Sequence, residues 1–172
     1  MSRTERLSLG VVLEHRRVPR GWQTDEWRVV GLLPSGVDDA LEPWTVMAEG
    51  EGWRRLYVGR VELELFPGET ASYRDNLSSS RPAVYVVLRR DAERGVALRE
   101  ATVDPGEIEA HAEAGDDLIE AVPLPEPVAA WMQDFIDRHH VERPFLKRQR
   151  DRADPDMLGR RPAVLRQEGR HG

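Results

Sequence analysis

Apolar residues that alternate with polar ones recur through the first hundred residues, and this period of two constrains the fold most. Residues 7–13 carry leucine or valine at every odd position, and residues 27–33 place Trp27, Val29 and Leu33 on one face. Successive side chains of a strand point to opposite faces, so both segments are predicted to be half-buried strands. Residues 84–88 are apolar on both faces, which predicts a central strand with residues 96–103 as its hairpin partner.

The apolar residues of a further predicted strand, residues 53–66, change phase along its length. They occupy even positions at Leu56 and Val58 but odd positions between residues 61 and 65. A shift of one residue turns every following side chain to the opposite face. We therefore expect Gly59 to mark a β-bulge or a sharp bend. The acidic segment that precedes this strand, residues 37–52, is predicted to be a long loop with Trp44 turned back.

Helical patterns appear later in the chain. Residues 69–77 are compatible with a short helix, and residues 104–114 begin with Asp104 as an N-cap, continue with Pro105 at the first helical position, and are followed by Gly115. From residue 128 the apolar side chains recur at i, i+3, i+4, i+7, i+8 and i+11, which predicts an amphipathic helix. The residues of this stripe are Val128, Trp131, Met132, Phe135, Ile136 and His139.

These patterns predict one α+β domain over residues 1–145. We expect an antiparallel, strongly curved or barrel-like sheet and two or three helices. Residues 146–172 have no apolar periodicity and are predicted to form a basic, largely disordered tail.

Charge is distributed unevenly over the chain. Residues 1–140 carry 16 arginines against 26 acidic residues, whereas residues 141–172 carry nine basic residues against five acidic ones. The acidic body disfavours nucleic acid, so a protein partner or a homo-oligomer is expected. Paired carboxylates such as Asp38 and Asp39 are interpreted as a solvated surface.

Several classes of function lack their usual signals. The chain contains no cysteine, which excludes disulfides and thiolate chemistry. The adjacent pair His139-His140 points in two directions on a helix and does not form a metal site. There is no glycine-rich phosphate loop. We therefore expect no catalytic residue, metal or cofactor, and the sequence favours a non-enzymatic protein.

The N-terminal segment and the overall hydropathy favour a cytoplasmic location. Residues 1–17 are too charged for a secretory signal, and no apolar run approaches the roughly 20 residues that span a bilayer. No membrane partner is expected.

Several blocks of sequence, in a fixed order over about residues 7–150, resemble an uncharacterised bacterial family catalogued as domain of unknown function number 3305. The family is similar to proteins encoded beside molybdenum-dependent formate dehydrogenases and their chaperones. The resemblance implies an accessory or assembly protein that acts by protein–protein contact on such an oxidoreductase. The blocks are Trp53-Arg-Arg-Leu-Tyr57, Glu69-Thr-Ala-Ser-Tyr-Arg-Asp-Asn-Leu77, Pro82-Ala-Val-Tyr-Val-Val-Leu-Arg89, Val122-Pro-Leu-Pro125, Val128-Ala-Ala-Trp-Met-Gln-Asp-Phe135, His139-His-Val-Glu-Arg-Pro-Phe145 and Lys147-Arg148.

Two alternatives remain open, a protein or enzyme that binds the molybdenum cofactor or a nucleotide, and a homo-oligomeric interaction module. A pocket for the first would contain Glu69, Tyr73, Asn76 and Arg89, although Asn76 as a helix cap and Glu69 paired with an arginine are also compatible with a structural role. The residues expected to contact a protein partner are Trp131, Phe135, His139, His140, Phe145, Lys147, Arg148 and Arg150.

Overall fold

The computed structural model describes residues 3–18 and 25–141. These residues belong almost entirely to one compact unit, Met1–His140. The predicted boundary at residue 145 and the predicted disorder of residues 146–172 lie outside the described part of the chain.

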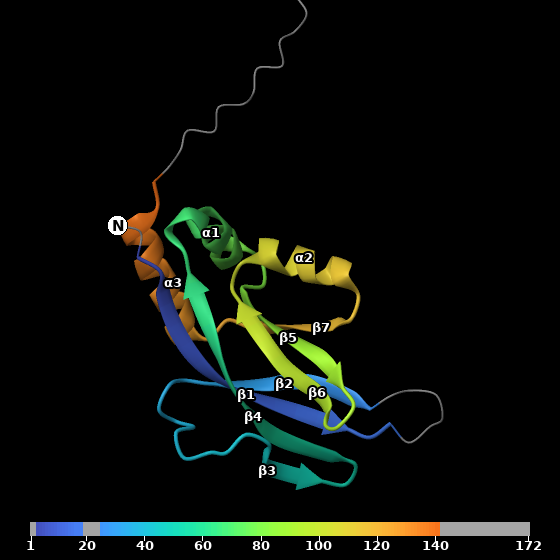
Figure 1. The fold of residues 1–172 in the computed structure, drawn as a ribbon. Helices are drawn as coiled ribbons and strands as arrows, with labels where there is room; N and C mark the ends of the chain where they lie inside the picture. The colour runs from blue at the N-terminus through green and yellow to red at the C-terminus, as the bar shows by residue number, and fades with distance from the viewer. Residues whose placement is uncertain (1–2, 19–24, 142–172) are drawn as a thin grey trace, which may run out of the picture. The chain divides into compact units, whose positions relative to one another are not determined.

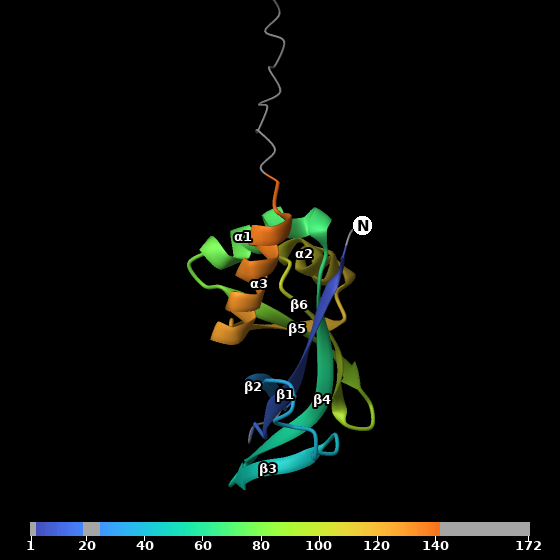
Figure 2. The ribbon, with the colours of Figure 1, turned by 90° about the vertical axis from the view of Figure 1, so that its left-hand side faces the viewer.

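The first sheet contains four antiparallel strands in the order β2-β1-β4-β3, as far as the described residues show. Strands β1 (Glu5–Arg16) and β4 (Trp53–Leu65) are long and pair along their whole length. Strand β2 (Glu26–Leu33) pairs with the second half of β1, and β3 (Thr45–Gly50) pairs with the first half of β4. The other halves of β1 and β4 continue as a two-stranded ribbon toward the helices (Figures 1 and 2).

The second sheet, also antiparallel, has the order β6-β5-β7 within the described residues. Its strands are β5 (Ala83–Asp91), β6 (Gly95–Thr102) and β7 (Asp117–Pro123). The helices are α1 (Thr70–Ser78), which follows the 3-10 turn Pro67–Glu69, α2 (Pro105–Ala114) and α3 (Glu126–His139). They gather at one end of the unit (Figure 1). None of the described helices has the length and apolarity required to cross a membrane.

One hydrophobic core joins both sheets to α1 and α3. It receives Leu63 and Leu65 from β4, Val84 and Val86 from β5, and Phe135 from α3, all of them fully buried. The predicted stripe of α3 is confirmed, since Val128, Met132, Phe135 and Ile136 are buried and Trp131 and His139 are half-buried. Fully burying each of these larger side chains contributes about 1.5–3 kcal/mol.

The predicted α+β class with antiparallel strands and helices is confirmed, although the strands are divided between two sheets. Strand β5 is central and β6 is its hairpin partner, as the sequence indicated. The Asp104 side chain accepts a hydrogen bond from the Gly106 amide (2.8 Å), and Gly115 ends α2 with a φ of 80°. Trp44 packs partly buried against the core, also as predicted.

Two strands differ from the sequence prediction. The segment that was predicted to be a long loop contains β3, and β7 was not predicted. Most side chains of β3 are exposed, so its stability comes from backbone pairing with β4 and leaves no apolar period in the sequence. Strand β7 is half-buried at the edge of its sheet and has a similarly weak pattern.

The buried side chain of Asn76 ties α1 to the second sheet. Its amide nitrogen donates to the carbonyl oxygens of Ala83 and Val103, both at 2.8 Å, and its amide oxygen accepts from the Ala83 N–H at 3.0 Å. Three backbone groups in the interior therefore depend on one side chain.

We expect Asn76→Ala to lower the free energy of unfolding by about 3 kcal/mol, because buried backbone groups left without a partner each cost about 1–3 kcal/mol. Urea unfolding measures this difference. Ser78→Ala, an exposed position on the same helix, is the matched control and should change stability by less than about 0.5 kcal/mol. Equal effects of the two substitutions would contradict this role of Asn76.

Candidate functional site

Two residues of the predicted pocket, Tyr73 and Asn76, have structural roles in the protein interior. Tyr73 is fully buried, its hydroxyl oxygen accepts a hydrogen bond from the Phe66 N–H at 2.9 Å, and its ring packs edge-on against Phe135. Burial raises the pKa of the Tyr73 hydroxyl to about 12. Asn76 is committed to the backbone hydrogen bonds described above. Neither side chain is free to bind a ligand in this structure.

The other two residues of that predicted pocket lie on the surface and apart. Glu69 is exposed immediately before α1. Arg89 pairs with Asp117 at 3.0 Å, and it lies six residues along β5 from Ala83, the backbone partner of Asn76. At the rise of a strand this separation is on the order of 20 Å. The expectation that Glu69, Tyr73, Asn76 and Arg89 share one pocket is therefore wrong.

The predicted partner-binding residues on α3 have different environments. Phe135 is fully buried, so it has no face available to a partner, contrary to the expectation. Trp131 is half-buried and its indole N–H donates to Glu5 at 3.0 Å. The His139 ring lies 4.5 Å from that of Phe135, and its Nε2 is buried without a hydrogen-bond partner in the part of the chain that is described.

The remaining predicted partner-binding residues follow in sequence. His140 caps the end of α3 and joins it to α1, with its Nδ1 3.0 Å from the Thr70 hydroxyl and its Nε2 3.0 Å from Arg74. Phe145, Lys147, Arg148 and Arg150 lie outside the described residues. Their part in partner binding stays a prediction.

A β-bulge in β4 changes the side of the strand to which the following side chains are directed. In the pairing with β1, Val11 lies opposite Gly59 but Val12 lies opposite Tyr57, so one residue of β4 is skipped. Gly59 has a φ of 120°, a conformation that favours glycine, and the predicted bulge is confirmed. Residues three apart normally face opposite sides of a strand. Because of the bulge, Tyr57 and Arg60 face the same side.

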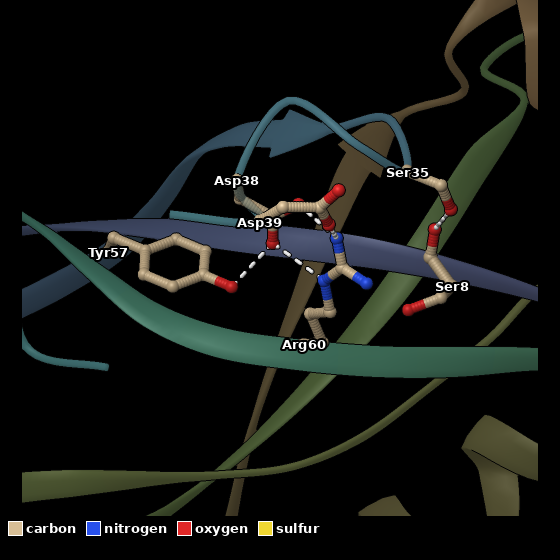
Figure 3. A network of polar contacts seen from close by, with 6 residues as sticks. All are labelled: Ser8, Ser35, Asp38, Asp39, Tyr57 and Arg60. Atoms are coloured by element: carbon tan, nitrogen blue, oxygen red, sulfur yellow. Dashed lines mark hydrogen bonds and ion pairs between the residues drawn. The ribbon is translucent and has the colours of Figure 1, made fainter. Parts of the chain in front are cut away.

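Tyr57 and Arg60 converge there on Asp38, which lies in the loop between β2 and β3 (Figure 3). Arg60 makes a bidentate ion pair with Asp38, with Nε–Oδ2 and Nη2–Oδ1 distances of 2.9 and 2.6 Å, and it also reaches Asp39 at 2.6 Å. The Tyr57 hydroxyl donates to Asp38 Oδ2. We refer to Asp38, Asp39, Tyr57 and Arg60 as the Asp38 network.

The Asp38 side chain is 0% exposed. The hydrogen bond from Arg60, with that from Tyr57, lowers the pKa of Asp38 to about 2 despite its burial. Gly10 of β1 lies beneath it, and a Cβ there would come within 2.6 Å of Asp38 Oδ2. The interpretation of Asp38 as a solvated carboxylate is therefore wrong, whereas Asp39 is 70% exposed. An acidic dipeptide gives no sequence signal that distinguishes the two.

Arg60 also lines a groove of about 460 Å³ on the surface between β4 and β6. We call it the β4–β6 groove. Strand β4 and the residue after it contribute residues 60, 61, 62, 64 and 66, β6 contributes residues 99–102, and α2 contributes Glu107. The outward-facing side chains of the groove are mostly charged, with Phe66, 37% exposed, as an apolar residue at its rim.

The groove is bordered by two strand edges that lack a partner. Strand β3 pairs with β4 only up to Tyr57, so the edge of β4 opposite β1 has no strand partner from Arg60 onward in the described residues. Strand β6 pairs with β5, and its other edge likewise has no partner there. The Cα atoms of β4 and β6 approach within 8 Å, so the two edges lie side by side and partly cover each other without forming a regular ladder.

The groove is acidic. Four glutamates and two arginines line it: Glu62, Glu64, Glu100, Glu107, Arg60 and Arg99. Glu64 pairs with Arg6 at 2.9 Å and Glu100 pairs with His111, whereas Glu62 and Glu107 have no ion-pair partner among the residues described. The charge of Arg60 is already shared between Asp38 and Asp39. A cationic group would therefore be attracted to this surface.

A third polar cluster crosslinks α2 to the second sheet. His111 contacts Glu100 of β6 and lies 3.2 Å from Asp117 at the start of β7, and Asp117 is held by Arg89. The Arg89 guanidinium lowers the pKa of the Asp117 carboxyl. No group of three or more histidine, aspartate or glutamate side chains within the described residues is arranged to hold a metal ion. This cluster stabilises the junction between α2 and its neighbouring strands.

The lowered pKa of Asp38 gives a test in acid. A carboxyl that ionises at about 2 in the folded protein and about 3.9 when unfolded stabilises the fold above pH about 4. This contribution, about 2.6 kcal/mol, is lost as the pH falls from about 4 to about 2. We expect Asp38→Asn to flatten the pH dependence of the free energy of unfolding in that interval, measured by urea unfolding at a series of pH values.

Asp39→Asn is the matched control, because Asp39 contacts the same arginine but is largely exposed. It should leave the pH dependence between about 4 and 2 nearly unchanged. If the Asp38→Asn variant kept the pH dependence of the free energy of unfolding of the unsubstituted protein, the Asp38 carboxylate would not stabilise the fold in this way.

One family model matches the sequence of this protein. Neither the curated proteins nor the solved structures include a match to this chain. A family model described as "Protein of unknown function (DUF3305)" matches residues 8–149, which cover the described strands and helices almost completely. The chain therefore belongs to the DUF3305 family.

Proposed function

We propose that this protein is a non-enzymatic accessory protein that acts by binding another protein through the β4–β6 groove. The partner in this proposal is a molybdenum-dependent oxidoreductase of the formate dehydrogenase type, or its chaperone. The family that the sequence resembles is similar to proteins encoded beside such enzymes, and this supports the identity of the partner. We further propose that the two proteins bind each other in the cytoplasm.

The acidic lining of the groove, in which Glu62 and Glu107 have no ion-pair partner among the described residues, is the observation that carries binding of a protein. The volume of about 460 Å³ lies within the roughly 300–1,000 Å³ of ligand pockets. Those pockets are lined mainly by apolar and aromatic side chains, whereas this groove is lined by charged side chains from two strands and a helix. A charged surface of this kind is complementary to a basic face of another protein.

The alternative of a cofactor- or nucleotide-binding protein has less support. Its candidate residues Tyr73 and Asn76 are occupied in the interior, and Arg89 lies at the far end of β5. A homo-oligomer uses the same kind of surface with a second copy as the partner, so sizing of the purified protein accompanies the test below.

Residues of α3 and the basic segment that follows it form a second contact in this proposal. Trp131 and His140 are only half-buried, and Phe145, Lys147, Arg148 and Arg150 add basic and apolar side chains. An acidic partner surface would be attracted to the basic segment. This contact is separate in sequence and in charge from the groove.

We expect the tagged full-length protein to co-purify with the dehydrogenase or its chaperone from cells that make this enzyme. Glu62→Lys/Glu107→Lys, which reverses the two unpaired carboxylates of the groove, should reduce recovery at least tenfold. Glu49→Lys/Glu51→Lys, at the end of β3 and in the turn that follows it, changes the net charge equally and should leave recovery unchanged. Lys147→Ala/Arg148→Ala/Arg150→Ala tests the second contact.

Reconstitution with purified components establishes whether the contact is direct. Absence of every dehydrogenase and chaperone subunit from the wild-type sample would overturn the identity of the partner. Equal recovery with the groove variant would instead show that binding does not use the groove. Self-association of the protein that competes for the groove would favour the homo-oligomer.

A further inference from the structure

We propose that a pocket at one end of the first sheet binds the phosphate group of a small anionic ligand. The pocket has a volume of about 220 Å³ and lies where β1 ends and β4 begins, away from the helices (Figures 1 and 2). Strand β1 and the residue after it contribute His15 and Arg17, β4 contributes Trp53 and Arg54, and residues 49, 50 and 52 complete the lining. We call it the Arg17–Arg54 pocket. It is separate from the β4–β6 groove and goes beyond the proposed function.

The strand pairing places the basic side chains of this pocket on one face. His15 lies opposite Arg54 in the ladder between β1 and β4. Arg17 follows two residues later, and its N–H donates to the carbonyl oxygen of Gly52 at 2.9 Å, so the pairing of the two segments extends to Arg17. Side chains two residues apart point to the same face of a strand. Arg17 and Arg54 are therefore diagonal neighbours, which are typically about 7–8 Å apart.

Neither of these two arginine side chains has an ion-pair partner within the described residues. Glu49 lies opposite Arg54 on the edge strand β3, but the two side chains, both of them exposed, form no ion pair. Two neighbouring guanidinium groups repel each other, and an anion between them removes this repulsion. By contrast, the other arginines of β1 and β4 each pair with a carboxylate: Arg6, Arg16, Arg55 and Arg60.

The imidazole of His15 is held in a fixed orientation at the wall of the pocket. Its side chain is 10% exposed, and its Nε2 lies 2.8 Å from Asp25 Oδ2. Because a carboxylate oxygen accepts hydrogen bonds, Nε2 carries the proton in this contact. The ring also stacks on Trp27, with ring centroids 4.1 Å apart and an angle of 11° between the planes. The other nitrogen, Nδ1, has no hydrogen-bond partner in the described part of the chain and is left to contact a ligand.

This set of groups favours a phosphate group over a carboxylate. A carboxylate has two oxygens, which a single guanidinium satisfies by bidentate pairing. The pocket offers two guanidinium groups and one imidazole nitrogen. A phosphate group presents three acceptor oxygens and a charge of about −1.5 to −2, so it can contact all three side chains. The volume of about 220 Å³ is smaller than the roughly 300–1,000 Å³ of pockets that enclose larger ligands, which indicates a small group.

The test uses the full-length protein and inorganic phosphate as the probe, with sodium chloride added to keep the ionic strength constant. NMR of the backbone amides measures the dissociation constant and locates the bound ion. We expect saturable shifts at residues 15–17 and 49–54. Acetate at the same ionic strength should bind at least fivefold more weakly, because it has fewer oxygens and a smaller charge. Glycerol 3-phosphate is a second probe: tighter binding than inorganic phosphate supports a phosphate ester as the ligand, and weaker binding supports the free ion.

Protein variants provide an independent arm. Arg17→Ala/Arg54→Ala should weaken binding of inorganic phosphate at least tenfold. Arg81→Ala/Arg90→Ala is the matched control, because it removes two other exposed arginines that have no ion-pair partner among the described residues, and it should change binding less than twofold. Circular dichroism confirms that each variant is folded. In the unsubstituted protein, the ¹⁵N shift of His15 Nδ1 should also change on addition of phosphate.

Absence of saturable phosphate shifts at constant ionic strength would overturn this inference, as would shifts confined to residues outside the pocket. Equal weakening by both pairs of substitutions would show that the overall charge attracts the ion and would also overturn it. Acetate that binds as tightly as phosphate would contradict the assigned ligand. No protein partner is present in these measurements, so their outcome is independent of the proposed function.

Discussion

The antiparallel ladder between β1 and β4, interrupted by the bulge at Gly59, is the element on which the rest of the structure depends. Before the bulge, β4 pairs on both edges and belongs to a four-stranded sheet. After the bulge, β1 is its one strand partner among the described residues, and its inward side chains enter the core shared with the second sheet. The change of phase also turns Tyr57 and Arg60 to one side, where Asp38 holds the loop between β2 and β3 against the strand. One extra residue thereby sets the course of the sheet, the position of the loop and the open edge.

The Asp38 network and the groove have Arg60 in common. Because its guanidinium is held by two carboxylates, Arg60 contributes a fixed wall to the groove and little free positive charge. The acidic character of the surface is then determined by Glu62 and Glu107, which have no ion-pair partner in the described residues. Nearby residues of one strand thus differ in environment: Tyr57 is buried, Arg60 is paired with two carboxylates, and Glu62 is exposed.

Side-chain periodicity was sufficient to predict β1, β5, the bulge at Gly59 and the buried stripe of α3, because each of these buries one regular face. It did not predict β3, whose stability comes from backbone pairing. The candidate pocket failed for a related reason. Polar residues such as Asn76 and Tyr73 stand out in a sequence whether they bind a ligand or satisfy buried backbone groups, and only the contacts distinguish the two. The groove itself was not predictable, because its walls are about forty residues apart in sequence and nothing in the sequence distinguishes its glutamates from other surface charges.

Beyond Gly59, the edge of β4 opposite β1 has no strand partner in the described residues, and amide hydrogen exchange of the free, full-length protein, measured by NMR, tests this pairing. We expect protection to alternate between residues 60 and 65, with slow exchange for amides bonded to β1 and faster exchange for those directed toward the groove. Uniformly slow exchange across these residues would contradict the account, because it would mean that the second edge is already paired.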